Sequence, residues 1–198
     1  DLGAVLTFWA DNLDEDYALQ IDAELVYKTA HLYMFVEVGQ AVDLAAIQRS
    51  ADAFEEIIRP RIHQVFGTEW TPGIDGDPRL YILHATGLGS WVAAYYGSNS
   101  AYPAEAVANS NEREMFYVNL DTMGGAIGTA YYEGVLAHEF QHMVHRHMDA
   151  NEDTWLNEGL SELATLIAGY GPSDFTWSFL QAPAIQLNTW PEDSRQRG

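Results

Sequence analysis

The stretch that decides the fold is YYEGVLAHEFQHMVHRHM, residues 131–148, followed after a short loop by TWLNEGLSELATLIAGYGP, residues 154–172. The first segment contains His138, Glu139 and His142 in the pattern HExxH. Four residues along an α-helix return a side chain to within ~40° of its starting direction, so the two imidazoles leave the same face one turn apart. They can therefore bind one metal ion, while Glu139 on the flank can reach a water on that ion.

The second segment supplies carboxylates that would complete such a site. We expect a short amphipathic helix that carries Glu158 in its first turns and has Asp153 or Thr154 as its N-cap. Gly169 and Gly171 offer C-terminal stops, and Pro172 ends the helix. A hydrolytic zinc site uses three protein ligands and keeps one position open, so Glu158 is the natural third ligand after His138 and His142. Glu162 follows on the same helix face and is placed to accept the outer N–H of a ligating histidine, which would fix its orientation.

The residues of the two motifs resemble those of a known protein family. HEFQH followed by WLNEGLSELA resembles the gluzincin zinc peptidases, in which HExxH is completed by a glutamate on a downstream helix. Asn157, Glu158, Ser161 and Glu162 match the thermolysin-like pattern NExxSD, with Glu in place of the final Asp. Together with FWADN, DGDPRLYILH and EMFYVNLD, the motifs are more similar still to the hyicolysin-type neutral metallopeptidases of bacteria. The motifs span residues 138–162, and the weaker upstream similarity covers most of the chain.

The resemblance implies a zincin-like α+β fold, with a mixed sheet that has an antiparallel edge strand and packs on a long helix and on the HExxH helix. It also implies a zinc-dependent endopeptidase, with Zn²⁺ held by His138, His142 and Glu158 and with Glu139 as general base. By strand order, the edge strand falls near residues 91–96, where a peptide substrate would pair with its backbone. The alternative is that the aromatic residues of this stretch pack in the core.

A hydrolase of this kind also needs a donor for the oxyanion. The gluzincins use a histidine or a tyrosine for this purpose, but no histidine follows His147 in this chain. Tyr131, Tyr132 and Tyr170 are the tyrosines near the two motif helices, and we expect Tyr170 to be the donor.

Upstream of the motifs, the residue pattern predicts a sheet and one long helix. Apolar residues at helical spacing predict a helix over residues 43–66, with a kink or break at Pro60. We expect a single domain over 1–198, made of a sheet-rich part, the metal-site helices and a C-terminal segment without a clear pattern. These three parts are 1–127, 128–172 and 173–198. Strands are predicted over 5–12, 23–29, 31–38, 79–85, 91–96 and 114–121.

Composition narrows the classes of partner. The chain has 198 residues, a net charge of −20 and no cysteine, which excludes disulfides and thiolate zinc ligands. Such an acidic chain is unsuited to nucleic acid or to an anionic membrane, and it contains no apolar run long enough to span a bilayer. It begins at Asp1 without an initiator Met or a signal peptide, so we expect a processed or excised domain of a longer, secreted or cell-surface bacterial protein.

Several alternatives remain open. His138 and His142 could be buried, hydrogen-bonded histidines of an ordinary helix, and His145, Asp149 or Asp153 could compete with Glu158 as the third ligand. A zinc-bearing domain could also act as a catalytically inactive binding module, although such a closed site has no use for a general base beside the ligands. A third functional alternative is an amide or ester hydrolase with the same fold. The other histidines without ligand spacing, which we expect to lie outside the site, are His31, His63 and His84.

Overall fold

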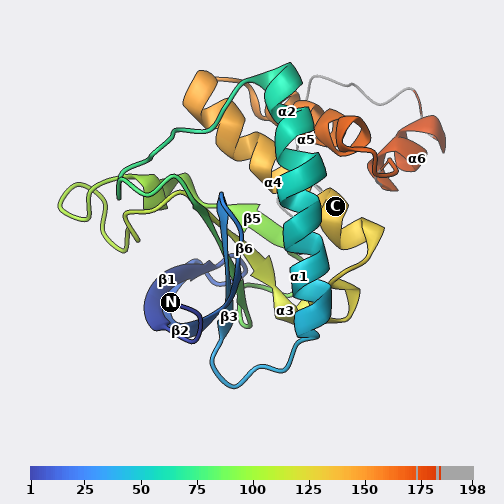
Figure 1. Cartoon of the computed structure of the whole chain (residues 1–198). Coiled ribbons are helices and arrows are strands. Elements are labelled where there is room, and N and C mark those ends of the chain that lie inside the picture. The colour runs from blue at the N-terminus through green and yellow to red at the C-terminus, as the bar shows by residue number, and fades with distance from the viewer. Residues whose placement is uncertain (173, 182, 184–198) are drawn as a thin grey trace.

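The computed structural model describes residues 1–172, 174–181 and 183, and it contains one six-stranded mixed sheet (Figure 1). The strand order is β1-β2-β3-β4-β6-β5. The two pairings at the centre of the sheet, β3 with β4 and β4 with β6, are parallel, whereas β1 with β2, β2 with β3 and β5 with β6 pair antiparallel. The bounds are β1 Val5–Asn12, β2 Tyr17–Lys28, β3 Leu32–Glu37, β4 Leu80–Ala85, β5 Ala94–Tyr96 and β6 Met115–Asn119.

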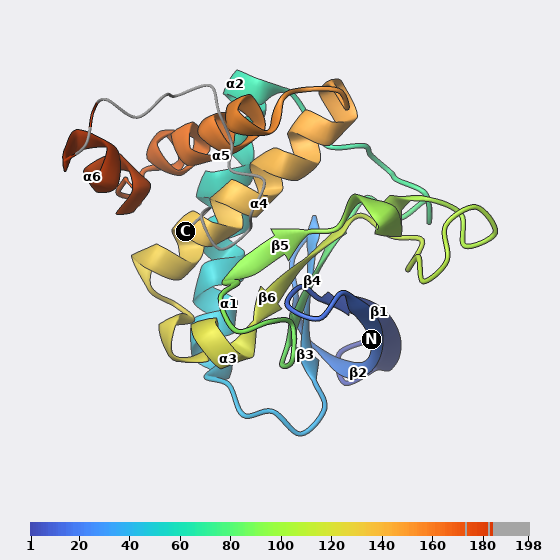
Figure 2. The ribbon, with the colours of Figure 1, turned by 180° about the vertical axis from the view of Figure 1, so that it is seen from behind.

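Burial along the strands explains how the sheet is placed. Every residue of β4 and β6 is buried, as expected for central parallel strands that are covered on both faces. The helices cover one face, and the curled β1–β2 hairpin closes over the other (Figures 1 and 2). The mixed α+β architecture expected from the sequence is therefore confirmed. β2 is longer than predicted, because it begins at Tyr17 and pairs with the whole of β1.

The long helix runs without a break over the predicted range. It consists of α1 (Leu44–Ala53), the π-helical turn η1 (Phe54–Ile58) and α2 (Arg59–Phe66). Pro60 has no N–H and its ring would clash with the carbonyl four residues back in a regular α-helix. The preceding turn is widened to a π-helix, so the helix continues past Pro60. Of the kink or break expected there, the break is absent, and the irregularity takes the form of this π-helical turn. Apolar side chains from all three parts enter the core, namely Ile47, Phe54, Ile58 and Ile62.

Two helices carry the motif residues. α4 (Ala130–Met148) begins after Thr129, whose hydroxyl accepts the N–H of Tyr132, and α5 (Thr154–Ala168) ends at Gly169. Gly169 has a φ of +99°, the left-handed conformation that ends many helices and that favours glycine. α4 packs between the sheet and α5 through a fully buried face (Figure 2). The residues of that face include Leu136, Phe140 and Val144.

Shorter elements complete the described part of the chain. They are α3 (Leu120–Met123), the 3-10 turns η2 (Ser98–Ala101) and η3 (Gly124–Ala126), and α6 (Asp174–Gln181). No pattern in the sequence predicted α6, and the rest of the C-terminal segment, 173, 182 and 184–198, lies outside the described residues.

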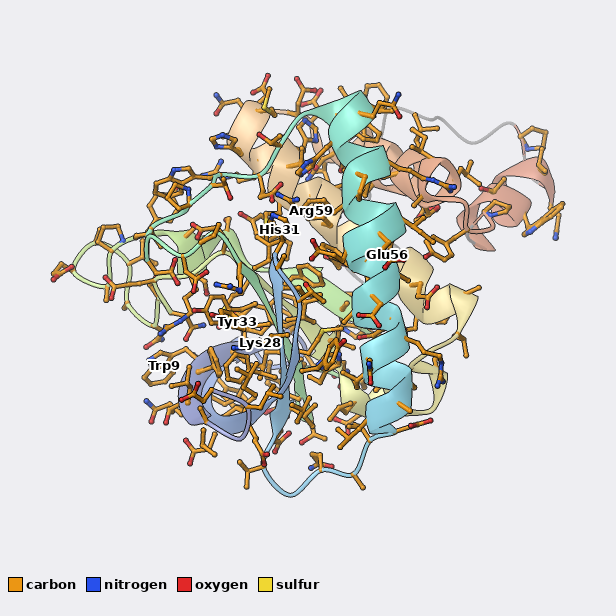
Figure 3. All side chains as sticks on the ribbon, viewed as in Figure 1. Trp9, Lys28, His31, Tyr33, Glu56 and Arg59 are labelled. Atoms are coloured by element: carbon orange, nitrogen blue, oxygen red, sulfur yellow. The ribbon has the colours of Figure 1, made fainter. Side chains whose placement is uncertain are left out.

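Two of the three histidines without ligand spacing support the contact between the long helix and its neighbours. His31 Nδ1 lies 2.5 Å from Glu55 Oε1. One turn further along the helix, Arg59 contacts the buried Glu69, which also pairs with His63. Figure 3 shows His31 and Arg59 at the same end of the helix. These pairings give both histidines carboxylate partners outside the metal cluster, as expected, although the His63 ring also packs against Phe140 of α4.

Candidate metal centre

The side chains of His138, His142 and Glu158 converge on one point between α4 and α5. The two Nε2 atoms of the histidines are 3.0 Å apart, and Glu158 Oε2 lies 3.4 Å from His138 Nε2 and 3.6 Å from His142 Nε2. Ligands bound tetrahedrally at ~2.0–2.2 Å are separated by ~3.3–3.6 Å, so these three atoms fit a zinc ion with little rearrangement. Within the described part of the chain, this is the only cluster of three or more such side chains with metal-binding spacing.

The outer nitrogen of His142 is held by two residues of α5. Its Nδ1 lies 3.1 Å from Asn157 Oδ1 and 3.0 Å from Ser161 Oγ. The Ser161 hydroxyl donates to Gln141 Oε1, so its oxygen is free to accept the Nδ1–H of the imidazole. A proton fixed on Nδ1 leaves the Nε2 lone pair directed at the metal position. Asn157 and Ser161 were matched to the motif, but their contact with His142 was not predicted. Their one-turn spacing on α5, which places both on one face of the helix, is the signal that could have indicated it.

The outer nitrogen of His138 has a different kind of partner. Glu162 Oε1 lies 3.3 Å from His138 Nδ1, one turn after Glu158 on the same face of α5. This is the position that the motif predicts for a carboxylate that orients a ligating histidine. Its effect on metal affinity stays a prediction.

Electrostatics favour a positive charge at the centre of the cluster. Burial disfavours the charged form of His138, but hydrogen bonding to Glu158 and Glu162, with the nearby Glu139 charge, raises its pKa to about 10. Burial also opposes ionisation of Glu158, yet His138 and His142 lower its pKa to about 2. The carboxylates of Glu139, Glu158 and Glu162 therefore surround two imidazoles. The same negative charges that favour protonation of His138 would stabilise a divalent cation at this point.

Glu139 lies beside the cluster and not within it. Its side chain is 6% exposed, and burial raises its pKa while the two imidazoles and the backbone N–H of Tyr96 act in the opposite direction. A carboxylate with a raised pKa accepts a proton more readily from a water molecule near neutral pH. Glu139 is therefore suited to proton transfer at this position.

A cleft of about 620 Å³ lies between β5 and α4 and contains the cluster on its wall. β5 is the last strand of the sheet, and Figure 2 shows it running in the same direction as α4. The N–H of Asn119 donates to Ala93 O, so by the alternation of an antiparallel pair the backbone groups of Ala94 and Tyr96 face away from β6. The predicted edge strand is thus present and has backbone groups that a further strand could pair with.

The structure separates the three tyrosines near the site. Tyr132 is fully buried and its hydroxyl lies 2.6 Å from His84 Nε2, so it is occupied within the core. Tyr170 lines a second cavity of about 420 Å³ together with His138 and Glu139, and its hydroxyl faces Glu133. Burial and the Glu133 carboxylate raise the pKa of the Tyr170 phenol. The structure therefore keeps Tyr170 close to the site.

Tyr131 is the third of these tyrosines. It lies seven residues before His138 on the same face of α4, is 65% exposed and lines both the cleft and the second cavity. It is therefore a second phenol within the cavities that contain the cluster.

The competing ligands lie outside the metal cluster. His145 is buried in the wall of the cleft, two turns after His138, and its Nδ1 has no hydrogen-bond partner among the described residues. Asp149 also lines the cleft, whereas Asp153 precedes the first turn of α5, and neither belongs to the group with metal-binding spacing. Glu158 is therefore the carboxylate that the fold brings to the two histidines.

Comparison of the chain with models of known protein families and with curated protein sequences found no match. In the described part of the chain, no helix combines the length and the apolar character needed to cross a bilayer. The chemistry of the cluster is therefore inferred from its own donor atoms and surroundings.

Proposed function

We propose that this protein is a zinc-dependent endopeptidase of the gluzincin type, with a zincin-like fold. One observation carries the proposal: His138, His142 and Glu158 offer two nitrogens and one oxygen at tetrahedral spacing, beside the buried carboxylate of Glu139 and on the wall of a cleft. Three ligands leave a fourth position for the reacting groups, which is typical of catalytic zinc sites and not of structural ones.

The residues present fit zinc by their chemistry as well as by their spacing. Imidazole nitrogens and one carboxylate are ordinary zinc ligands, and the partners of both outer nitrogens fix the rings. When bound, Zn²⁺ would supply a Lewis acid that polarises the scissile carbonyl and acidifies a water molecule. Glu139 would accept the proton of that water and deliver it to the nitrogen of the leaving amine.

The exposed edge of β5 supports a peptide as the substrate. An extended peptide can pair with the outward-facing backbone groups of Ala94 on this edge, which would hold a scissile bond between the edge and the cluster. The N–H of Tyr96 already bonds to Glu139. Antiparallel pairing is the more stable arrangement, so we propose that the peptide runs opposite to β5. The Tyr170 phenol is the proposed oxyanion donor, because it shares a cavity with His138 and Glu139.

Metal analysis and a protease assay test the proposal together. Purified protein should contain one zinc per chain, and the double substitution His138→Ala with His142→Ala should remove it. Glu139→Gln should retain zinc but hydrolyse unfolded casein about 10²- to 10⁴-fold more slowly than the parent. Stoichiometric zinc in the double variant would reject the metal site. A zinc-containing parent that leaves casein intact would instead identify a catalytically inactive binding module.

A further inference from the structure

A third cavity, distinct from the one that Tyr170 lines, adjoins the cleft beyond the C-terminal end of β5, and we call it the Arg146 pocket. It has a volume of about 210 Å³ and is lined by Trp70, Tyr96, Tyr102, Glu114, Arg146 and His147, among others. Tyr96 and Arg146 also line the main cleft, so the two spaces are continuous along β5 and α4. A group that enters the Arg146 pocket can therefore belong to a peptide that lies in the cleft.

Arg146 is fixed in this pocket without a carboxylate partner. Its Nη2 donates to the Tyr102 hydroxyl at 2.6 Å, and its Nη1 donates to Ala150 O at 3.0 Å. Arg59 and Arg79 form ion pairs with carboxylates, whereas none is found for Arg146 among the described residues. A guanidinium has five N–H donors, so several remain available on a group that is already held in place.

No ion pair between Arg146 and a nearby acidic residue is found in the described part of the chain. Glu114 also lines the pocket, but its Oε1 accepts the N–H of Ile74 and its Oε2 is buried against Gly73. Asp149 and Glu152 line the main cleft and not the Arg146 pocket. The free donors of Arg146, together with His147, thus make the pocket locally suited to an anionic group.

We propose that the Arg146 pocket recognises an acidic side chain of the peptide substrate. This inference rests on the proposed peptidase function and adds a substrate preference to it. A side chain carboxylate can accept two parallel N–H bonds from a guanidinium, a geometry that a neutral amide does not reproduce. The aromatic residues Trp70, Tyr96 and Tyr102 can pack against the aliphatic part of the same side chain.

Helix and strand geometry place the preferred residue. Arg146 follows His142 by one turn and His138 by two, which puts it ~9 Å along α4 from the midpoint of the two ligands. An extended peptide advances ~3.3 Å per residue, so the acidic residue lies two or three positions from the cleaved bond. Since β5 and α4 run in the same direction (Figure 2) and the peptide is antiparallel to β5, the residue is on the amino side.

The experiment is cleavage-site profiling with the zinc-loaded full chain and the peptides from a chymotryptic digest of a bacterial lysate, which retain internal Asp, Glu, Lys and Arg. Asp and Glu should be enriched at the second or third position before the cleaved bond. For a synthetic pair that differs only by Glu or Gln at that position, the acidic peptide should have a roughly 5- to 50-fold lower KM. Arg146→Met should abolish the preference, and Arg146→Glu should replace it with a preference for Lys or Arg. Arg49→Met, a change at an exposed position of α1, is the matched control and should keep the parental profile.

The outcomes separate this inference from the proposed function. Cleavage by the parent without enrichment of acidic residues, or with an enrichment that persists in Arg146→Met, would overturn the role of Arg146 and leave the peptidase intact. Failure of the zinc-loaded parent to cleave any peptide would overturn both. Binding gives a second measurement: Glu139→Gln should bind the Glu peptide more tightly than the Gln peptide by fluorescence anisotropy, and equal affinities would reject the recognition of the carboxylate.

Discussion

The two histidines of the cluster are held by chemically different partners, although they lie one turn apart on the same helix. His142 has neutral partners, Asn157 and Ser161, whereas His138 has the carboxylate of Glu162. A neutral acceptor orients the ring, and a carboxylate also makes the ring a stronger electron donor to a metal. Removal of Glu162 should therefore weaken the bond between His138 and zinc in two ways, because the ring loses both its fixed orientation and the carboxylate that strengthens it as a donor.

For Glu162→Ala, we expect zinc affinity to fall roughly 10- to 100-fold while the metal still binds. Glu162→Asp should lower zinc affinity less than Glu162→Ala, because the carboxylate is retained and α5 needs to move toward His138 only by about the length of one methylene. A competition titration with a zinc-binding dye measures both. Glu56→Ala serves as the control, since Glu56 is exposed on the long helix (Figure 3). If Glu162 is only a solvated charge, its alanine variant will bind zinc as tightly as this control.

The proposed oxyanion donor can be tested by removal of a single hydroxyl. Tyr170→Phe should lower kcat about 10²- to 10³-fold with little change in KM, because an oxyanion contact is made in the transition state and not in the bound substrate. Tyr131→Phe is the comparison, since Tyr131 lines the same cavity. Steady-state kinetics on an unfolded substrate distinguish them. A loss of kcat in Tyr131→Phe alone would assign the role to Tyr131.

At the scale of elements, the cluster connects two helices that also meet through side-chain packing and through the hydrogen bond from Ser161 to Gln141. His138 and His142 come from α4, and Glu158 comes from α5. A ligand that binds only the folded state at a concentration ~1,000-fold above its Kd stabilises that state by about 4 kcal/mol. Zinc that bridges α4 and α5 should therefore contribute to the stability of the whole fold.

We accordingly expect removal of zinc with a chelator to lower the melting temperature by roughly 8–16 °C, a shift typical of ~4 kcal/mol in a chain of this size. Differential scanning calorimetry with and without added zinc measures the change. The double variant His138→Ala with His142→Ala should show no zinc-dependent shift. The same shift in parent and double variant would mean that the metal stabilises the protein at another place.

The motif helices and the central strands could be predicted because local signals define them. Helical spacing and HExxH located α4 to within one residue, and Asp153 and Gly169, which cap α5, were among the predicted caps. Apolar runs located β4 and β6. The start of β2 was missed because residues 17–22 lie before the apolar run and become a strand only by pairing with β1. The π-helical turn before Pro60 was missed because the sequence shows a proline but not how the backbone adapts to it.

The site was predictable only where its residues belong to a motif. His138, His142, Glu158 and Glu162 were chosen from their spacing, and the fold brings them together. The Arg146 pocket was not, because Trp70 and Tyr102 reach it from loops whose course depends on tertiary contacts. Long-range contacts of this kind leave no periodic signal in the sequence.

At the scale of the whole molecule, one buried histidine connects the sheet to α4. His84, on β4, is fully buried; its Nδ1–H donates to Phe35 O on β3 at 2.8 Å, and its Nε2 lies 2.6 Å from the Tyr132 hydroxyl on α4. With the proton on Nδ1, Nε2 accepts from the phenol, so the neutral ring satisfies both neighbours. A second proton would place a charge in the core without a carboxylate among these contacts.

This arrangement predicts that the protein loses stability as the pH falls. Burial lowers the pKa of His84 from 6.5 to about 4, although the carbonyl of Phe35 acts in the opposite direction. The unfolded chain therefore binds a proton at a higher pH than the folded one, and the contribution of His84 is complete above pH 6.5 and is lost as the pH falls toward 4. Between pH 7 and pH 5 this residue alone should reduce the free energy of unfolding by about 2 kcal/mol. Urea unfolding at both values tests it, with His84→Gln as a reference that cannot titrate; carboxylates affect both proteins alike, so equal losses in the two would show that His84 does not cause the dependence.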